Sequence, residues 1–112
     1  LIVDGLLTPK SYYQNECYQA ALLWARTEGF ISAPETSHAI AAVVAEAKRA
    51  KEEGKEKTIL FNWSGHGLMD LVGYDKYMQG QLKDVEFTDE EMAEGLKCLK
   101  GHPQPVGGVV IG

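Results

Sequence analysis

One short apolar run sets the strongest limit on how this chain can fold. Residues 58–63, Thr-Ile-Leu-Phe-Asn-Trp, follow a charged turn and precede a Ser-Gly-His-Gly loop. Continuous hydrophobicity, without alternation, is typical of a strand buried on both faces of a parallel sheet. One strand cannot form a sheet, so its partners must come from polypeptide outside this chain, from a second copy, or from the apolar residues 1–3. We therefore expect an incomplete α/β domain that associates with other polypeptide or with itself.

The remainder of the sequence favours helices. Apolar residues spaced three and four apart predict four of them, each with a start or stop signal beside it. They are expected over residues 11–28, from just after an extended link at 30–34 to about 51, over 68–79, and from about 88 to 100. Gly29 is placed to end the first helix, and Thr88 with Glu91 has the spacing of a capping box. The fold class expected is thus α/β, mostly helical with one buried strand.

Length and composition narrow the class of protein. With 112 residues, the chain is expected to be a single incomplete domain over 1–112, ending in a Gly/Pro-rich tail over 102–112. The net charge of −5, with bases interleaved among acids, makes nucleic acids and anionic membranes poor partners. No apolar stretch reaches the ~18 residues of a membrane span, so a cytoplasmic location is expected. Cys17 and Cys98 lack disulfide or zinc spacing and are read as buried or half-buried small residues.

The motif Asn-Trp-Ser-Gly-His-Gly at 62–67 stands at the carboxyl end of the predicted strand. In open α/β sheets this is where ligands bind, because the strand ends open into a crevice. Ser64 offers a neutral hydroxyl, and Gly65 and Gly67 allow close backbone approach to a ligand. The alternative is an ordinary turn, since Ser and Gly are common wherever a strand leads into a helix.

A second motif, Ala-Pro-Glu-Thr-Ser-His at 33–38, opens the second predicted helix. Glu35 is favourably placed in the first turn, where a carboxylate complements the helix dipole whatever the function. His38 and His66 have no second ligand at metal-binding spacing, so no metal site is predicted.

These two motifs, together with Ala-Arg-Thr-Glu-Gly-Phe-Ile at 25–31 and Asp70, resemble the carboxyl-terminal portion of the tryptophan synthase beta chain. The resemblance covers roughly residues 11–77. The form Ser-Gly-His-Gly, together with Ala-Pro-Glu-Thr-Ser-His, is similar to the longer second-type subfamily. The expected protein is therefore a fragment of a pyridoxal phosphate enzyme of fold type II.

The resemblance implies roles for individual residues. The serine that matches Ser64 hydrogen-bonds the pyridine nitrogen of pyridoxal phosphate, and a neutral hydroxyl there suits β-replacement better than transamination. Gly65 and Gly67 are expected to let the loop lie against the cofactor ring. The glutamate that matches Glu35 lies beside the ring near its phenolic oxygen and is the expected catalytic residue. The implied reaction joins L-serine and indole to give L-tryptophan.

Essential parts of such an enzyme precede the matched segment. The resemblance places the cofactor-binding lysine, the phosphate-binding loop and the acid that activates indole upstream, so the fragment alone is expected to be inactive. The partners implied are the remainder of the beta chain, further copies of it and a tryptophan synthase alpha subunit. The alternatives are a free-standing module that oligomerises or binds a partner, and an anion-binding domain that uses the loop from Gly65 to Gly67.

Overall fold

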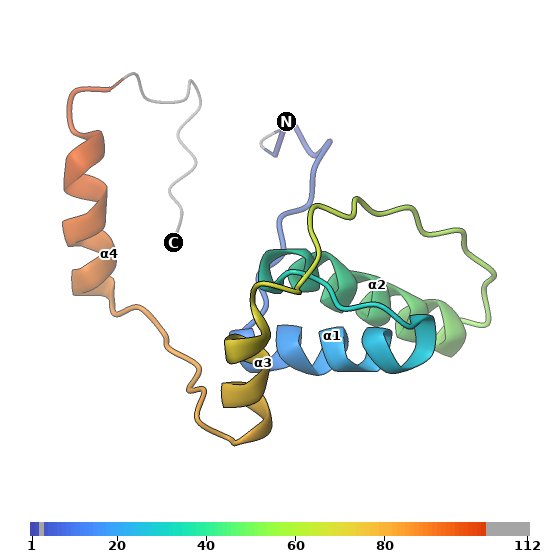
Figure 1. Ribbon diagram of the computed structural model, residues 1–112. Coiled ribbons are helices and arrows are strands. Elements are labelled where there is room, and N and C mark those ends of the chain that lie inside the picture. Colours follow the sequence, from blue (N-terminus) through green and yellow to red (C-terminus); the bar gives the residue numbers. More distant parts are fainter. Residues whose placement is uncertain (3, 103–112) are drawn as a thin grey trace. The chain divides into compact units, whose positions relative to one another are not determined.

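The computed structural model of this protein describes residues 1–2 and 4–102. They form two compact units, one of Lys10–Asp84 and one from the described parts of Leu1–Pro9 and Val85–Gly112. The helices are α1 (Gln14–Glu28), α2 (Pro34–Glu52), α3 (Leu71–Met78) and α4 (Asp89–Leu96), and a 3-10 turn over Lys97–Leu99 follows α4 (Figure 1). The mostly helical character predicted from the sequence is confirmed. Nearly all of the expected tail, from residue 103 onward, lies outside the described residues.

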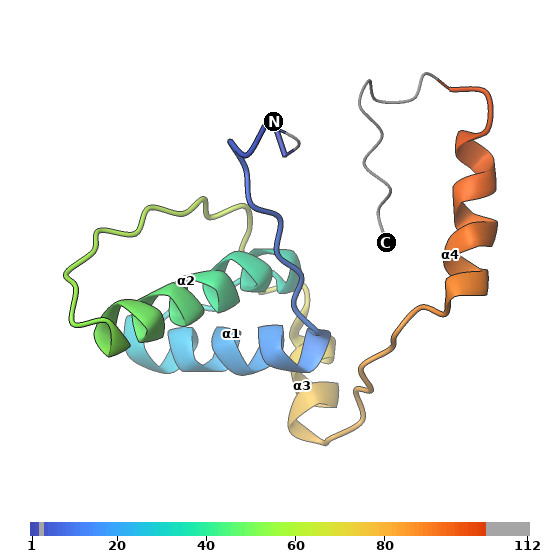
Figure 2. The same ribbon diagram turned by 180° about the vertical axis from the view of Figure 1, so that it is seen from behind.

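Helices α1 and α2 lie side by side and form the core of the larger unit (Figures 1 and 2). Gly29 ends α1 at φ 84° and donates its amide to the Ala25 carbonyl, as its place in the sequence predicts. Pro34 occupies the first turn of α2, where its missing amide proton costs nothing. The residues buried between the two helices are mostly small, which lets the helix backbones approach closely: Cys17, Ala20, Ala21, Ile40 and Ala41.

Helix α3 is shorter than predicted and packs on α1 through aromatic rings. The chain turns before the helix begins, with the Asp70 amide donating to the Gly67 carbonyl at 3.0 Å. Tyr74, the buried residue of α3, meets the ring of Tyr18 edge-on at a centroid distance of 5.1 Å. Tyr77 stacks on the same tyrosine at 5.6 Å. These contacts fix α3 against the start of α1.

The buried strand predicted over 58–63 is not formed here, since the described residues contain one isolated bridge and no strand. The segment runs as a loop in Figure 1, and none of its backbone groups joins the backbone hydrogen bonds formed outside the helices. A strand needs a neighbour to pair its amides and carbonyls, and helices offer none. Of the partner strand considered at residues 1–3, Leu1 and Ile2 are exposed and Val3 lies outside the described residues.

One side of this segment nevertheless packs on the helices. Phe61 and Trp63 are partly buried against the α1–α2 core. The Trp24 ring lies 5.3 Å from that of Phe61 and 5.7 Å from that of Trp63, and Phe30 lies 5.0 Å from Trp63. Leu60, which precedes Phe61, points outward and is 95% exposed, and Asn62, between the two packed rings, is exposed as well. The segment therefore has the two-residue alternation of a strand, but only one of its faces is covered.

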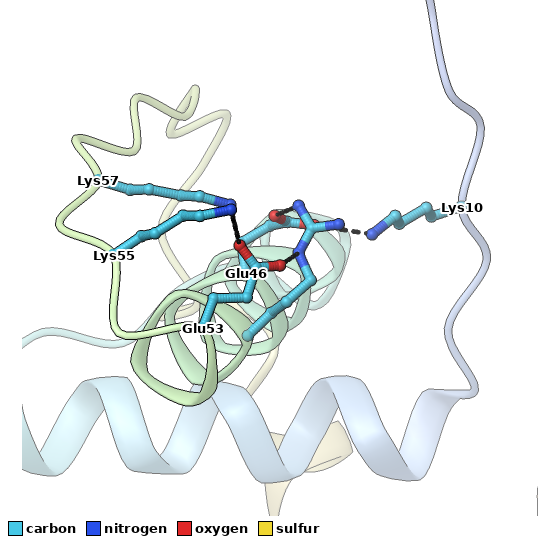
Figure 3. A network of polar contacts seen from close by, with 6 residues as sticks. Lys10, Glu46, Glu53, Lys55 and Lys57 are labelled. Carbon is cyan, nitrogen blue, oxygen red and sulfur yellow. Dashed lines mark hydrogen bonds and ion pairs between the residues drawn. The ribbon is translucent and has the colours of Figure 1, made fainter.

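Ion pairs on the outer side of α2 tie down the chain before α1 and the turn after α2 (Figure 3). Two glutamates of α2 and its end, Glu46 and Glu53, are surrounded by Lys10, Arg49, Lys55 and Lys57. The Lys10 Nζ lies 2.8 Å from a Glu46 carboxylate oxygen, and this hydrogen bond, with the Arg49 charge, holds the pKa of Glu46 below its usual value.

The second unit contains α4, whose start is defined by hydrogen bonds at its own N-terminus. The Thr88 hydroxyl accepts from the Glu91 amide at 3.2 Å, and the Glu91 carboxylate accepts from the Thr88 amide at 2.9 Å, which confirms the predicted capping box. No residue of α4 is buried. Cys98, in the turn that follows, is exposed, so its predicted burial is wrong, whereas Cys17 is buried as predicted. Within the described residues, no helix combines the length and apolar character needed to cross a bilayer.

Candidate functional site

The loop over residues 64–67 lies against the connection between α1 and α2. The Ala33 amide donates to the Gly65 carbonyl at 2.9 Å, and the Gly67 amide donates to the Ile31 carbonyl at the same distance. Ser32 and His66 form the isolated antiparallel bridge between these two bonds. Two motifs that stand far apart in the sequence are thus brought together by backbone pairing.

This close approach requires glycine at 67 and leaves little room for a larger residue at 65. A Cβ on Gly67 would overlap the Ser32 carbonyl oxygen and lie 2.8 Å from the Ile31 Cγ2 atom, so no larger residue fits without a shift. A Cβ on Gly65 would lie 3.3 Å from the Ala33 Cβ, which is a tight contact. The glycines therefore have a structural reason in the protein itself, and their predicted contact with a ligand remains a prediction.

Ser64 is held by a hydroxyl at the beginning of α2. The Thr36 Oγ1 lies 2.7 Å from the Ser64 Oγ, 3.0 Å from the Gly65 amide nitrogen and 3.2 Å from the Gly65 carbonyl oxygen. Thr36 is only 1% exposed, whereas Ser64 is an exposed residue. Thr36 stands in the motif that the sequence singled out, but its role depends on a partner 28 residues away and was not predicted.

A second group of hydroxyls, those of Ser32, Ser37 and Tyr74, forms hydrogen bonds at the segment against which the loop packs. Ser32 and Ser37 are buried, and their Oγ atoms lie 3.0 Å apart. The Tyr74 hydroxyl donates to the Ser32 carbonyl at 2.6 Å and lies 3.1 Å from the Ser32 Oγ. The Tyr74 bonds join α3 to Ser32, against whose backbone the loop packs, whereas the bonds of Ser37 go to Ser32 and Ala33. Sequence reasoning missed this group as well.

Glu35 precedes Thr36 on the first turn of α2, and both Glu35 and His38 are exposed. A small cavity of about 170 Å³ opens beside these two residues, with Gln14, Cys17, Tyr18 and Pro34 completing its wall. Burial raises the pKa of the Tyr18 hydroxyl, and the charges of Tyr74, Asp70 and Glu35 act in the same direction. Ser64 is not in this wall, so the structure brings the predicted site residues to one turn of α2 but not into one cavity.

A larger hollow of about 880 Å³ lies elsewhere, between α1 and α2 and beside the end of α3. Its wall includes Leu23, Val44 and Met78 and none of the predicted site residues. Among the described residues, no group of three or more His, Cys, Asp or Glu side chains is placed to hold a metal ion.

The exposed polar side chains of the loop are those of Ser64 and His66. The Ser64 hydroxyl can donate one hydrogen bond without bringing charge. The Glu35 carboxylate, next to Thr36 on the first turn of α2, is exposed.

The sequence of the chain is similar to portions of known proteins. No family model matches the chain. The chain is 56% identical over 86 residues to the tryptophan synthase beta chain of Thermococcus gammatolerans, which covers 77% of this chain and 20% of that protein. It is 52% identical over 102 residues to the tryptophan synthase beta chain of Thermococcus onnurineus, covering 91% of this chain and 22% of that protein.

A third relative extends the likeness along the chain. The tryptophan synthase beta chain 2 of Pyrococcus furiosus is 51% identical over 105 residues, which is 94% of this chain and 22% of that protein. A match of this extent includes α4, whichever end is left out, and so reaches beyond the residues on which the resemblance was first based. The chain spans about a fifth of the length of the curated relatives it matches.

Proposed function

Since this chain is homologous to a portion of the tryptophan synthase beta chain, we propose that it forms the part of such a subunit which supports the cofactor ring. The activity proposed for the complete subunit is the replacement of the L-serine hydroxyl by indole to give L-tryptophan. The observation that carries the proposal is the rigidly held Ser64 hydroxyl, which lies 2.7 Å from the buried Thr36 beside Glu35.

Ser64 is proposed to bind the ring nitrogen of pyridoxal phosphate. When bound, that cofactor supplies an electron sink for bonds at the amino acid's α-carbon. A hydroxyl donates to the nitrogen without giving up its proton, whereas a carboxylate in that place would favour a protonated nitrogen. Ser64 therefore keeps the ring a moderate electron sink, which favours β-replacement over transamination.

Glu35 is proposed to act at the other side of the ring, near its phenolic oxygen. Its carboxylate is exposed on the first turn of α2, where the helix dipole stabilises negative charge. A carboxylate held there disfavours a second negative charge on the adjacent ring oxygen. It thereby biases where the shared proton of the bound substrate resides.

The covalent lysine is proposed to come from the preceding part of a beta chain. A lysine that forms an imine must lose its proton, which requires a desolvated setting. In the described chain, Lys10 is paired with Glu46 at 2.8 Å, and Lys48 and Lys76 are exposed. This distribution supports a site to which the present chain contributes only one wall.

The backbone edges of residues 58–63 are proposed to pair with that missing polypeptide, as a neighbouring strand in a parallel sheet. The segment already alternates, with Phe61 and Trp63 packed inward and Leu60 fully outward. Within residues 1–2 and 4–102, its backbone groups form no backbone hydrogen bond. Further copies of the subunit and an alpha subunit are proposed as partners. The complete subunit is proposed to act in the cytoplasm.

A split-enzyme experiment tests the proposal. The chain is produced together with the portion of the Thermococcus gammatolerans beta chain that it does not match, and pyridoxal phosphate is titrated by its absorbance. Saturable binding and formation of L-tryptophan from L-serine and indole are expected from the mixture and from neither piece alone. The Ser64→Ala variant is expected to weaken cofactor binding and slow the reaction. An assembled mixture that binds no cofactor would overturn the proposal.

A further inference from the structure

The Thr36 hydroxyl has three polar atoms within hydrogen-bond distance but only one proton to donate. Its oxygen accepts a hydrogen bond from the Gly65 amide at 3.0 Å, so one of its lone pairs is occupied. Its single proton has two acceptors in reach, the Ser64 Oγ at 2.7 Å and the Gly65 carbonyl oxygen at 3.2 Å. The direction of this proton decides what Ser64 can offer to a ligand.

Two observations direct the Thr36 proton to Ser64. The Ser64 oxygen is the closer acceptor, at 2.7 Å from the Thr36 Oγ1, compared with 3.2 Å for the Gly65 carbonyl oxygen. The Gly65 carbonyl already accepts the Ala33 amide at 2.9 Å, so only its second lone pair is open to the longer Thr36 contact. A hydroxyl that accepts from a neighbour turns its own proton away from that neighbour. The Ser64 proton is therefore directed away from Thr36, on the exposed side of the loop.

We infer that Thr36 is a positioning residue: it makes Ser64 present a hydrogen-bond donor, so that the site takes an unprotonated ring nitrogen. This inference rests on the proposed function. The bonds form one ordered series, from the Gly65 amide to Thr36, from Thr36 to Ser64, and from Ser64 to the nitrogen. Each donor in such a series strengthens the next, because it polarises the group to which it donates. Burial of Thr36 keeps water from competing for the same bonds.

A double-mutant cycle in the split enzyme tests this role. Thr36→Val removes the hydroxyl and keeps the branched shape, and it is expected to raise the dissociation constant for pyridoxal phosphate by roughly three- to tenfold. In the Ser64→Ala background the same substitution is expected to change that constant by less than about twofold, because Thr36 then has nothing to orient. Thr36→Ser is expected to restore binding. An equal loss in both backgrounds would show a merely structural role and overturn the inference.

Ser37→Ala is the matched control, since Ser37 is equally buried on the same turn but bonds to Ser32 and Ala33. With ¹⁵N-labelled pyridoxal phosphate, the ring-nitrogen chemical shift is expected to move in Thr36→Val and to stay in Ser37→Ala. A shift that moves equally in both would contradict the inference.

A measurement without cofactor separates this inference from the proposed function. In the 112-residue chain alone, hydrogen exchange of the Gly65 amide is expected to become roughly three- to tenfold faster in Thr36→Val and to stay unchanged in Ser37→Ala. If the wild-type split enzyme bound no cofactor but exchange changed in this way, the proposed function would fail while the anchoring by Thr36 stood. Unchanged exchange in Thr36→Val would overturn the anchoring itself.

Discussion

The α1–α2 pair and α4 differ in the interactions that stabilise them. Neither α1 nor α2 has a side-chain hydrogen bond at its N-cap, yet both bury residues against each other. Helix α4 has a complete capping box and buries nothing. Isolated helices shorter than about 12–15 residues are marginal in water, so local capping alone gives α4 little stability. The difference teaches that tertiary burial holds the larger unit together, whereas sequence-local bonds set only where α4 begins.

The largest test of this contrast removes a core side chain. Ile40 is fully buried between α1 and α2, so Ile40→Ala is expected to lower the free energy of unfolding of the Lys10–Asp84 unit by about 2–4 kcal/mol. The matched change in α4 is Met92→Ala, at a residue 42% exposed, with an expected effect below about 0.5 kcal/mol. Urea titration followed by circular dichroism measures both. Equal effects would remove the distinction between the two regions.

Two glycine-to-alanine substitutions, one in each unit, test the same comparison. Gly67→Ala forces a Cβ onto the Ser32 carbonyl and is expected to cost about 1–3 kcal/mol of unfolding free energy. Gly95→Ala in α4 meets nothing within 4 Å and is expected to stabilise that helix by about 0.5–1 kcal/mol. The two substitutions are chemically the same and should have opposite signs in urea titration and in helix content. A stabilising Gly67→Ala would show that the loop does not rest on residues 31–32.

Loss of the cap should affect α4 alone. Thr88→Ala removes the hydroxyl that accepts the Glu91 amide and is expected to cost about 1 kcal/mol of local helix stability. Carbon-13 chemical shifts of residues 89–96 report this loss residue by residue. The urea midpoint of the Lys10–Asp84 unit is expected to stay at its wild-type value, and a shift of that midpoint would show that the two units do not unfold independently.

The smallest expected effect concerns the ion pairs of α2. Because Lys10 and Arg49 hold the pKa of Glu46 below its unfolded value, the pair stabilises the fold at neutral pH. That contribution is lost as the pH falls below the ordinary glutamate range and through the lowered pKa. Lys10→Met should flatten this acid dependence of the thermal midpoint slightly, and high salt should do the same. Lys76→Met, at a lysine of α3 outside this network, is the control and should leave the profile unchanged.

Local signals predicted the helices more successfully than the extended segment. Gly29 ends α1 and the Thr88–Glu91 capping box begins α4 as expected, because each signal acts on backbone groups three or four residues away. The strand over 58–63 was expected from its apolar run, but strand formation requires hydrogen-bond partners that the helices around it do not supply. Hydrophobicity alone could not distinguish packing on one face from burial on two.

The candidate site shows the same division. Ser64, Gly65, Gly67 and Glu35 were chosen from residue type and motif, whereas Thr36 was passed over although it stands next to Glu35. A threonine at a helix start has an ordinary local explanation, and nothing in its sequence neighbourhood reveals a partner in another loop. The role proposed for Thr36 required the distances to Ser64 and Gly65.

By itself, the sequence determined which stretches are helical, that α1 ends at Gly29 and α4 begins after Thr88, and which enzyme's motifs the chain carries. Capping and periodicity are short-range, and motifs are residue identities, so both can be read without coordinates. Only the tertiary structure decided that Thr36 anchors Ser64, that Gly67 must be glycine because Ser32 lies against it, and that one face of 58–63 stays open. These facts depend on which distant segments meet, and that is settled by burial and by the pairing of polar groups across the whole unit.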